Sequence, residues 1–341
     1  MKYLITGSCG FIGSHLTDVL LARGHSVVGI DDLTTGSIEN ILHLKSHPRF
    51  QYYIDSVTNE RLLAELIDYS DAVFHLAAVV GVRLVVDEPV RTIKTNIECT
   101  ELVLKHAAKK KRKVLIASTS EVYGKSPSLP YAEDGDLVYG PTTKSRWSYA
   151  FSKAIDEFLA LAYHKTHALP VIIVRLFNTV GARQTGQYGM VLPRFVKQAV
   201  TGRALTVYGD GAQRRCFCHV ADVTQALANL MATDECVGEI YNVGGQEEVT
   251  ILDLAERIRA RFNPGAKIEF VPYDVAYEPG FEDMMQRRPD ISKIAKAIGF
   301  SPQRSLAEMI EDVGQHVTRG AQAEAPGTRG VPALAGEPAL A

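Results

Sequence analysis

The sequence of 341 residues contains few cysteines, and their spacing does not suggest a cross-linked or metal-bound protein. The five are Cys9, Cys99, Cys216, Cys218 and Cys236, an odd number without the paired CxxC spacing of structural zinc sites. A disulfide framework needs paired cysteines and an oxidising compartment. We therefore expect no metal site, no disulfide framework and a location in the reducing cytoplasm.

Long apolar runs and an excess of one charge are missing as well. No stretch approaches the run of about eighteen apolar residues that a membrane helix needs, and no basic and apolar leader precedes the first predicted strand. The 37 Lys and Arg and 39 Asp and Glu leave a formal net charge of −2, so no basic surplus is available to hold nucleic acid or an acidic membrane. We expect neither a nucleic-acid partner nor a membrane partner.

The first half of the chain alternates short apolar runs with amphipathic segments. The runs lack strict alternation, which is typical of parallel strands buried on both faces. Strands are predicted at Tyr3–Thr6, Ser26–Ile30, Phe50–Ile54, Ala72–Leu76, Val114–Ala117 and Val171–Phe177. Helices are predicted at Ser14–Arg23, Asn59–Ile67, Val90–Lys110 and Tyr149–His167. This order predicts an α/β protein with a doubly wound parallel sheet of the Rossmann type and a smaller α/β substrate lobe.

The first predicted strand leads directly into a glycine-rich segment, Gly7-Ser8-Cys9-Gly10-Phe11-Ile12-Gly13, and then into a helix. Glycines let the backbone approach a pyrophosphate, and the helix N-terminus supplies free N–H groups. Asp31 ends the second strand, where a carboxylate binds the ribose hydroxyls and repels a 2′-phosphate. The pattern predicts NAD rather than NADP. Asp55 ends the third strand and could contact the adenine or belong to the N-cap region before Thr58–Glu60.

After Asn178, Gly and Pro residues interrupt the alternation of strands and helices, which suggests a change of domain. Residues 1–177 are predicted to form the NAD-binding domain, to which 222–245 return with a strand at Ile240–Val243. Residues 178–221 and 246–318 are predicted to form the nucleotide-sugar-binding lobe, with helices at Leu252–Phe262 and Leu306–Val317. Residues 320–341 have no aromatic side chain and no periodicity, which predicts a disordered tail.

Two side chains on one predicted helix suggest proton transfer. Tyr149 and Lys153 are four positions apart and share a helix face. An ammonium beside a phenol favours the phenolate, so we expect a lowered pKa for Tyr149 and a role in taking a proton from a substrate hydroxyl. The hydroxyl side chains of Ser118-Thr119-Ser120 follow the fifth strand and would face the same site.

Five motifs occur in one order: GSCGFIG (7–13), HLAA (75–78), STSEVYG (118–124), SYAFSK (148–153) and RLFN (175–178). In this order they resemble the extended short-chain dehydrogenases/reductases of the NAD-dependent nucleotide-sugar epimerase/dehydratase family, over residues 1–317. The resemblance implies NAD as the cofactor and a catalytic set of Thr119, Tyr149 and Lys153, joined by Ser120 and Glu121. The cofactor site that it implies consists of Gly7, Gly10, Phe11, Ile12, Gly13, Asp31, Asp32, Asp55, Ser56, Leu76, Ala77, Ala78, Asn96, Tyr149 and Lys153.

The second half resembles the segments that hold the nucleoside diphosphate in this family. LTVYGDGAQRRCFCHVAD (205–222) places Arg215 at the position of the diphosphate-binding arginine, and QRRPD places Arg287 at that of a substrate arginine. The resemblance also implies that Asn178, Arg194 and Tyr208 bind the substrate. Surface ion pairs are the structural alternative for the arginines.

Family members share a first step, in which C4 of the sugar is oxidised to a ketone, and differ afterwards. The order Thr119-Ser120-Glu121 resembles UDP-glucuronate decarboxylases (UDP-xylose synthases), and FEDMMQRRPDISK (281–293) aligns with their active-site arginine at Arg287. Dehydratases have an Asp where this chain has Ser120, which disfavours dehydration. FNTVGARQTGQYGMVLPRF (177–195) is more similar to epimerases, so a UDP-glucuronate or UDP-glucose 4-epimerase is the alternative. A non-catalytic NAD-binding protein would be expected to lack Tyr149 or Lys153.

In the family, the helix after the fourth strand and the helix that carries the tyrosine pair across a two-fold axis as a four-helix bundle. This resemblance implies a homodimer. The corresponding helices here offer apolar side chains at Ile93, Ile97, Leu104, Phe158, Leu161 and Ala162, although some of these must pack on the sheet instead.

Overall fold

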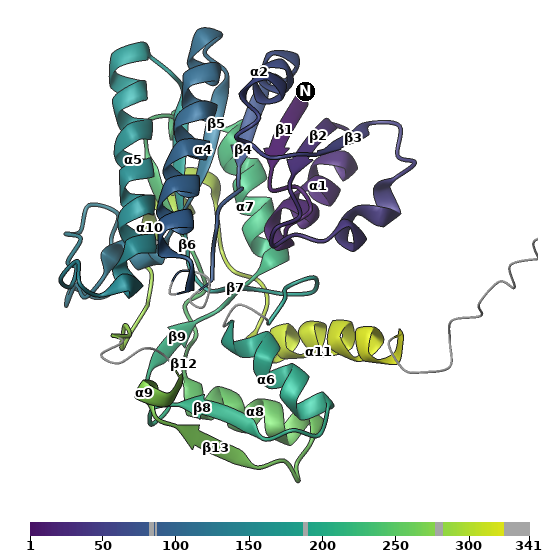
Figure 1. Cartoon of the computed structure of the whole chain (residues 1–341), viewed down its shortest axis with the longest axis vertical. Helices are drawn as coiled ribbons and strands as arrows, with labels where there is room; N and C mark the ends of the chain where they lie inside the picture. The colour runs from purple at the N-terminus through teal and green to yellow at the C-terminus, as the bar shows by residue number, and fades with distance from the viewer. Residues whose placement is uncertain (82–84, 86, 187–189, 277–281, 324–341) are drawn as a thin grey trace, which may run out of the picture.

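A seven-stranded parallel sheet forms the centre of the computed structural model, which describes residues 1–81, 85, 87–186, 190–276 and 282–323 (Figure 1). The strand order is β11-β6-β5-β4-β1-β2-β3. The strands are β1 (Lys2–Thr6), β2 (Ser26–Asp31), β3 (Phe50–Ile54), β4 (Ala72–His75), β5 (Lys113–Thr119), β6 (Val171–Leu176) and β11 (Ile240–Val243). The chain leaves β1 toward β3, then returns to build the other half from β4. This reversal confirms the predicted doubly wound sheet and creates a crevice at the carboxyl ends of β1 and β4.

Each face of the sheet has its own core because successive strand residues point to opposite sides. Tyr3 and Ile5 pack in one buried cluster and Leu4 in the other. The first cluster includes residues of α1 (Phe11–Ala22), α7 (Val220–Ala232) and α10 (Ser292–Ile298). The second includes residues of α2 (Glu60–Tyr69), α4 (Pro89–Lys109) and α5 (Ser148–His167). Burial on both faces explains why the strands read as continuous apolar runs.

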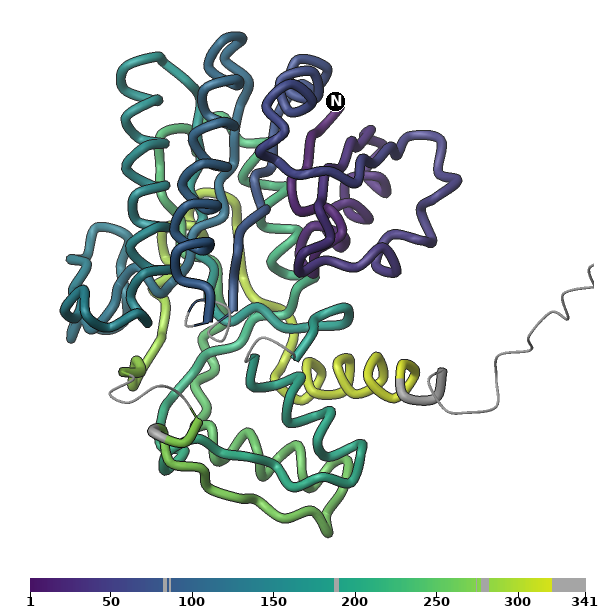
Figure 2. Tube along the Cα trace, viewed as in Figure 1, coloured from purple at the N-terminus to yellow at the C-terminus, as the bar shows by residue number. Residues whose placement is uncertain are grey.

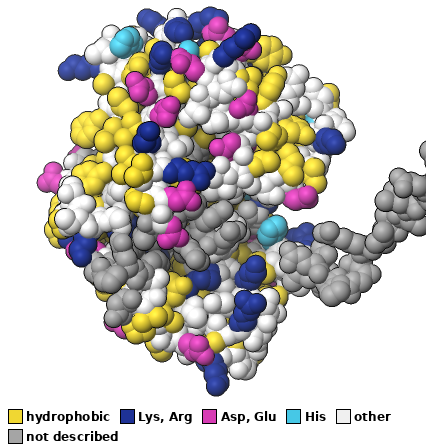
Figure 3. Space-filling model, viewed as in Figure 1, with side chains coloured by type: hydrophobic (Ala, Val, Ile, Leu, Met, Phe, Trp, Pro, Cys, Tyr) yellow, Lys and Arg dark blue, Asp and Glu magenta, His cyan; other side chains and the backbone are white. Residues whose placement is uncertain are grey.

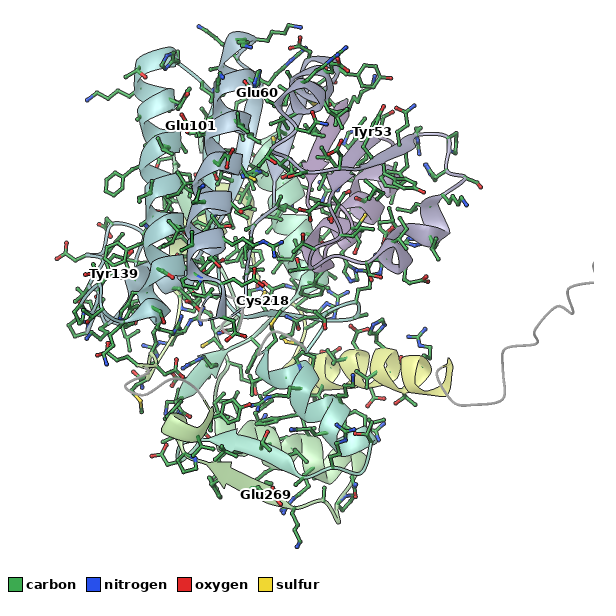
Figure 4. All side chains as sticks on the ribbon, viewed as in Figure 1. Tyr53, Glu60, Glu101, Tyr139, Cys218 and Glu269 are labelled. Carbon is green, nitrogen blue, oxygen red and sulfur yellow. The ribbon has the colours of Figure 1, made fainter. Side chains whose placement is uncertain are left out.

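A smaller lobe lies beyond the carboxyl ends of the strands (Figure 2). Its core packs side chains from three helices and two parallel strands. These elements are α6 (Val191–Val200), β8 (Leu205–Tyr208), α8 (Ile251–Phe262), β13 (Ile268–Val271) and α11 (Leu306–Ala323). Short pairs join it to the large sheet: β7 (Thr179–Val180) with β10 (Cys218–His219), and β9 (Arg214–Cys216) with β12 (Glu248–Thr250). Figure 4 labels Cys218 near the centre of the molecule, between the two lobes.

Several short elements complete the described chain. They are η1 (Ile38–Leu44), η2 (Ser120–Tyr123), η3 (Ser145–Trp147), η4 (Asp234–Cys236) and α9 (Tyr273–Ala276). Of these, η2 directly follows β5 and η3 directly precedes α5, so they position the residues around Thr119 and Tyr149.

Three features of the fold differ from the sequence prediction. The helices α6 and α7 were not predicted, because Gly- and Pro-containing stretches surround them. Residues 291–300 were assigned to the small lobe, whereas Ile291, Ile294 and Phe300 pack in the first cluster of the large sheet, an arrangement that only long-range packing determines. Residues 320–323, predicted as part of the disordered tail, are helical instead, because α11 continues through Ala323 and alanine favours helix. Residues 324–341 of that tail lie outside the described residues.

Surface charge, the character of the helices and the state of the cysteines bear on what the protein can bind. Basic and acidic side chains are interspersed over the upper lobe on the face shown in Figure 3. Among the described residues, no helix combines the length and apolar character needed to cross a membrane. All five cysteines are unpaired and buried, and no group of three or more His, Cys, Asp or Glu in the described ranges could hold a metal ion.

Candidate active site

A cavity of about 740 Å³ lies at the carboxyl edge of the large sheet and extends to the small lobe. Gly7, Asp31 and Tyr149 line it from the large sheet's side, and Arg194 and Arg215 line it from the other. This location is the crevice in which doubly wound folds bind their ligands. Its volume lies within the range of about 300–1,000 Å³ that is typical of small-molecule and cofactor sites.

The glycine-rich turn after β1 forms a cradle without side chains. Gly7 has φ +75, which L side chains rarely adopt, and its N–H donates to the Ile30 carbonyl at 2.8 Å. A Cβ on Gly13 would lie 2.1 Å from the Gly7 carbonyl oxygen, so a side chain there would block the turn. Gly10 is the N-cap of α1 and has no side chain to satisfy the helix N–H groups. The cradle therefore fits a pyrophosphate at the helix N-terminus. Phe11 and Ile12 line the same cavity.

Asp31 lies at the end of β2 with its carboxylate directed to the loop around it. The N–H groups of Cys9 and Leu33 donate to its two oxygens, each at 2.8 Å. Burial raises the pKa of Asp31, and the hydrogen bonds from Leu33 and Cys9 oppose that shift. The side chain is thus fixed at the cavity wall, where it can accept hydrogen bonds from ribose hydroxyls. Asp32 lines the cavity beside it.

Two predicted cofactor residues support their neighbours and do not line the cavity. Asp55 accepts hydrogen bonds from the N–H of Ser56 at 2.7 Å and from the side-chain amide of Asn59 at 2.8 Å. Asn59 is the N-cap of α2, so the N-cap alternative describes Asp55 in this structure. The Asn96 side chain accepts from the N–H of Val79 at 2.8 Å and is buried. Ser56, Leu76, Ala77 and Ala78 do line the cavity, as does Val79.

Tyr149 lies in the first turn of α5, opposite Thr119 at the end of β5. Only 8% of Tyr149 is exposed, and burial raises its pKa, with further increases from the carboxylates of Glu121 and Asp156. A hydrogen bond with Thr119 and the charge of Arg287 act in the opposite direction. In the free protein Tyr149 is therefore a protonated phenol rather than the phenolate that its spacing to Lys153 suggested.

Lys153 does not offset the effect of burial on the Tyr149 phenol. Its Nζ donates to Asp156 Oδ2 at 2.7 Å, and both side chains are buried. The ammonium is neutralised by a carboxylate three residues further along α5, so its effect on the phenol is weakened. The spacing of Tyr149 and Lys153 is visible in the sequence, but the competing pair of Lys153 and Asp156 is not. Lys153 does not line the cavity in this structure.

A charged cluster lies next to Tyr149. Arg146 of η3 forms a buried ion pair with Glu121 of η2, and Arg287 Nη1 lies 3.5 Å from the other oxygen of Glu121. Arg287 also donates to Ser120 Oγ, from Nη2 at 2.5 Å and from Nε at 3.2 Å. Burial alone would raise the pKa of Glu121, but Arg146 and Arg287 lower it below its usual value. Glu121 is therefore a carboxylate at neutral pH.

The arginines predicted from the sequence are mostly buried, which excludes simple surface pairs. Burial lowers the pKa of Arg287 to about 10. Arg215 Nη2 lies 3.0 Å from Asp283 Oδ2, and the Arg215 side chain is 8% exposed. The guanidinium carbon of Arg194 lies 4.0 Å from the ring centroid of Tyr208, and its Nη1 donates to Thr206 Oγ1 at 2.9 Å. Such a stacked pair offers a flat surface to a planar ligand.

The remaining residues separate into those that reach the cavity and those that do not. Thr119, Glu121, Asn178, Arg194, Tyr208, Arg215 and Arg287 line it together with Tyr149. Asn178 donates to the Cys216 carbonyl at 2.9 Å, which ties the end of β6 to β9. Ser120 is fully buried beneath Arg287 and does not line the cavity.

Sequence reasoning did not single out Arg146 and Asp283, which both line the cavity. Arg146 precedes Tyr149 by three residues, and that proximity is the signal that could have found it. Asp283 comes from a distant segment, and only the fold brings it to Arg215 and Arg146, the latter at 3.9 Å from Nη2 to Asp283 Oδ1.

The fold and the site define an NAD-dependent enzyme of the extended short-chain dehydrogenase/reductase class. The family model described as GDP-mannose 4,6 dehydratase matches residues 4–313, and the chain belongs to this family. The family resemblance stated from the motifs is thereby confirmed.

Two curated relatives are decarboxylases. The chain is 41% identical over 316 residues to the UDP-N-acetyl-alpha-D-glucosaminuronate decarboxylase of Bacillus cytotoxicus, covering 92% of this chain and 97% of the relative. It is 38% identical over 308 residues to UDP-glucuronic acid decarboxylase 1 of Arabidopsis thaliana, covering 90% of this chain and 68% of the relative.

A similar solved structure is an epimerase. The UDP-glucuronic acid 4-epimerase of Bacillus cereus, solved with UDP-glucuronic acid and NAD, superposes with a TM-score of 0.85 at 31% identity. The superposition covers 94% of this chain and 99% of that one. NAD as the cofactor and an enzymatic function on a nucleotide sugar are thus confirmed. The family membership alone does not select one reaction, since its members differ after the first step.

The arrangement at Asp31 predicts how cofactor selectivity depends on one charge. Asp31→Asn should weaken NAD binding about tenfold or more and reduce the preference for NAD over NADP, because a charged acceptor is lost and the repulsion of a 2′-phosphate ends. Fluorescence titration with NADH and NADPH measures both effects.

The matched control is Asp32→Asn, which removes the same charge one residue away and should have a smaller effect on selectivity. Thermal unfolding of both variants checks that the loop around Cys9 and Leu33 remains folded. An unchanged ratio of NADH to NADPH affinity in Asp31→Asn would contradict this role for Asp31.

Proposed function

We propose that the protein is a UDP-uronate decarboxylase that oxidises C4 of the sugar, releases the C6 carboxylate as CO₂ and reduces the ketone again. The large-sheet lobe binds NAD and the small lobe binds the nucleotide. UDP-glucuronate is the substrate inferred from the motifs, and UDP-N-acetylglucosaminuronate is the second substrate to be tested, because it is named for the relative with 41% identity.

The observation that carries this proposal is the charged cluster beside Tyr149. Arg146, Arg215 and Arg287 face two carboxylates, Glu121 and Asp283, so one positive charge is in excess within the cluster. An arginine fork suits a carboxylate because its donors match the two oxygens. Arg287 lines the same cavity as Tyr149, which makes it the arginine that would bind a uronate carboxylate beside the reacting carbon.

The residues that line the cavity can support the three parts of this reaction, which are oxidation at C4, loss of CO₂ and reduction. NAD held by the glycine cradle and Asp31 would supply an acceptor for the C4 hydride and a donor for its return, with no net consumption of the cofactor. Tyr149, once it has lost its own proton, takes the proton of the C4 hydroxyl, and Thr119, which shares a hydrogen bond with Tyr149, would contact the same sugar oxygen. A ketone at C4 makes the sugar a β-keto acid, which loses CO₂ because the electrons of the broken bond flow into the carbonyl. Thr119 and Tyr149 stabilise the resulting enolate oxygen through hydrogen bonds until C5 takes up a proton from water, which restores the ketone for reduction.

A 4-epimerase is the second candidate. The observation in its favour is the similarity to the UDP-glucuronic acid 4-epimerase structure at a TM-score of 0.85. An epimerase uses the same tyrosine but lets the 4-keto sugar rotate and accept hydride on its other face. Both reactions accept a uronate, so affinity for the substrate does not separate them.

The mass of the product separates the two candidates. Incubated with NAD and either UDP-uronate, the protein should form a nucleotide sugar lighter by one CO₂, as measured by liquid chromatography and mass spectrometry. Tyr149→Phe is the control, which should lose at least about a hundredfold in rate because proton transfer at C4 is removed. A new isomer of unchanged mass would show that the epimerase reading is correct instead.

The pair of Lys153 and Asp156 predicts the pH dependence of turnover. Tyr149 must lose its proton to act as a base, so activity falls as pH drops below its pKa. Asp156 raises that pKa, both directly and by neutralising Lys153. Asp156→Asn should therefore move the acid limb of the kcat/KM profile to lower pH.

Glu101→Gln is the control for this shift. Glu101 is exposed on α4 (Figure 4) and does not line the cavity that Tyr149 lines, so its loss should leave the profile in place. An acid limb that stays unchanged or moves to higher pH in Asp156→Asn would contradict the role given to Asp156.

We also propose that the protein is a homodimer in the cytoplasm. The helices α4 and α5 run side by side in Figure 1 and expose apolar side chains. The exposed ones are Val90, Ile93, Phe151, Ile155 and Phe158, and Phe158 is 71% exposed. Leu104, included in the predicted face, packs in the core of the sheet instead. A two-fold axis would let these helices cover one another. Five free, buried cysteines suit a reducing compartment.

A charged side chain in this face should separate the subunits. Phe158→Glu should sediment as a monomer at micromolar concentration, while the wild-type chain sediments as a dimer, because burying a carboxylate in an apolar interface is costly. Phe270→Glu is the matched control, since Phe270 is 54% exposed on β13 of the small lobe. A monomeric wild-type protein, or a dimeric Phe158→Glu variant, would contradict the proposed interface.

A further inference from the structure

Asp283 places a carboxylate on the arginine that the family resemblance assigns to the diphosphate. Asp283 Oδ2 lies 3.0 Å from Arg215 Nη2 and accepts a hydrogen bond from the Tyr273 hydroxyl at 3.3 Å. The other oxygen accepts from the N–H of Met284 at 2.8 Å and lies 3.9 Å from Arg146 Nη2. Asp283, Arg215, Tyr273 and Arg146 all line the cavity.

The position of Asp283 has an electrostatic reason. Burial lowers the pKa of Arg287, and the charges of Arg215 and Arg146 lower it further, so both of these guanidinium groups repel that of Arg287. Buried positive charges without counter-charges are costly, and Asp283 supplies a counter-charge to two of the three. In the free protein the carboxylate keeps Arg215 in place, and its partner Tyr273 holds the carboxylate.

A bound nucleoside diphosphate changes this balance. Arg215 Nη1 already donates to the Arg214 carbonyl at 2.9 Å, and Nη2 faces Asp283. A diphosphate that uses the Arg215 fork brings negative oxygens to the same guanidinium. Two anions on one guanidinium edge repel each other at short range. Asp283 and the diphosphate therefore compete for Arg215.

We propose that Asp283 is a stand-in for the substrate diphosphate, which pairs with Arg215 in the free protein and gives up this arginine when the nucleotide binds. This inference rests on the proposed function, since it assumes that the cavity binds a UDP-sugar. It makes Asp283 a residue that sets nucleotide affinity: a ligand must offer enough negative charge to replace the carboxylate. The cost of the replacement weakens binding, and product release becomes easier for the same reason.

The sign of one affinity change tests the proposal. Isothermal titration with UDP should show tighter binding to Asp283→Asn than to the wild-type chain, by about threefold or more. The substitution removes the negative charge that competes for Arg215 and keeps a side chain of the same shape. Asp283→Ala, which also removes the acceptor for Tyr273, should tighten UDP binding as well. Thermal unfolding establishes that both variants are folded at the temperature of the titration.

Two controls separate competition at Arg215 from a general change in charge. Glu282→Gln removes the adjacent carboxylate, which pairs with Lys125 at 3.1 Å and not with Arg215, and should leave UDP affinity within about twofold. In an Arg215→Gln background, Asp283→Asn should no longer tighten UDP binding, because the two anions have no arginine to compete for.

The possible results distinguish a failure of this inference from a failure of the proposed function. Weaker UDP binding by Asp283→Asn would overturn the proposal and show that Asp283 orients Arg215 for the ligand. An unchanged affinity, or equal tightening in the Arg215→Gln background, would overturn it too. A wild-type chain that does not bind UDP at all would contradict the proposed function itself, which distinguishes that failure from a failure of this inference.

Discussion

The buried ion pair between Glu121 and Arg146 is the contact on which the reacting end of the site depends. It joins η2, which follows β5, to η3, which precedes α5, and so sets the distance between Thr119 and Tyr149. Because Arg146 occupies one oxygen of Glu121, Arg287 can approach the other and still donate to Ser120. The same carboxylate contributes to the raised pKa of Tyr149. The contact between η2 and η3, the placement of Arg287 and the pKa of Tyr149 therefore all depend on the Glu121 carboxylate.

The parallel sheet brings this cluster to the cofactor. Strands β1, β2 and β5 end at one edge, so the glycine cradle, Asp31 and Thr119 face one cavity although they are far apart in the sequence. The small lobe closes the other side with Arg194 and Arg215. Opposite ends of one cavity are thus suited to different charges: neutral backbone and the carboxylates of Asp31 and Asp32 at the dinucleotide end, and an excess of positive charge at the sugar end. This asymmetry orients an anionic sugar toward Tyr149.

Features that depend on local pattern could be predicted from the sequence. Strands buried on both faces produce continuous apolar runs, and residues at strand ends, such as Gly7, Asp31 and Thr119, reach the crevice by topology alone. What could not be predicted depends on partners distant in sequence or on competing pairs. Asp156 neutralises Lys153 and changes the expected pKa of Tyr149, and α10 packs on the large sheet rather than the small lobe. Asp55 caps a turn, while Asp283 reaches Arg215 only in the folded chain.

The central claim is that the cluster around Glu121, Arg146 and Arg287 receives a sugar carboxylate. Binding to the Tyr149→Phe variant with NAD present tests this most directly, because turnover is blocked and charge complementarity is measured alone. Isothermal titration should give an affinity for UDP-glucuronate at least about tenfold higher than for UDP-glucose, since an arginine–carboxylate contact distinguishes the two ligands. Equal affinities, or a preference for UDP-glucose, would contradict the account.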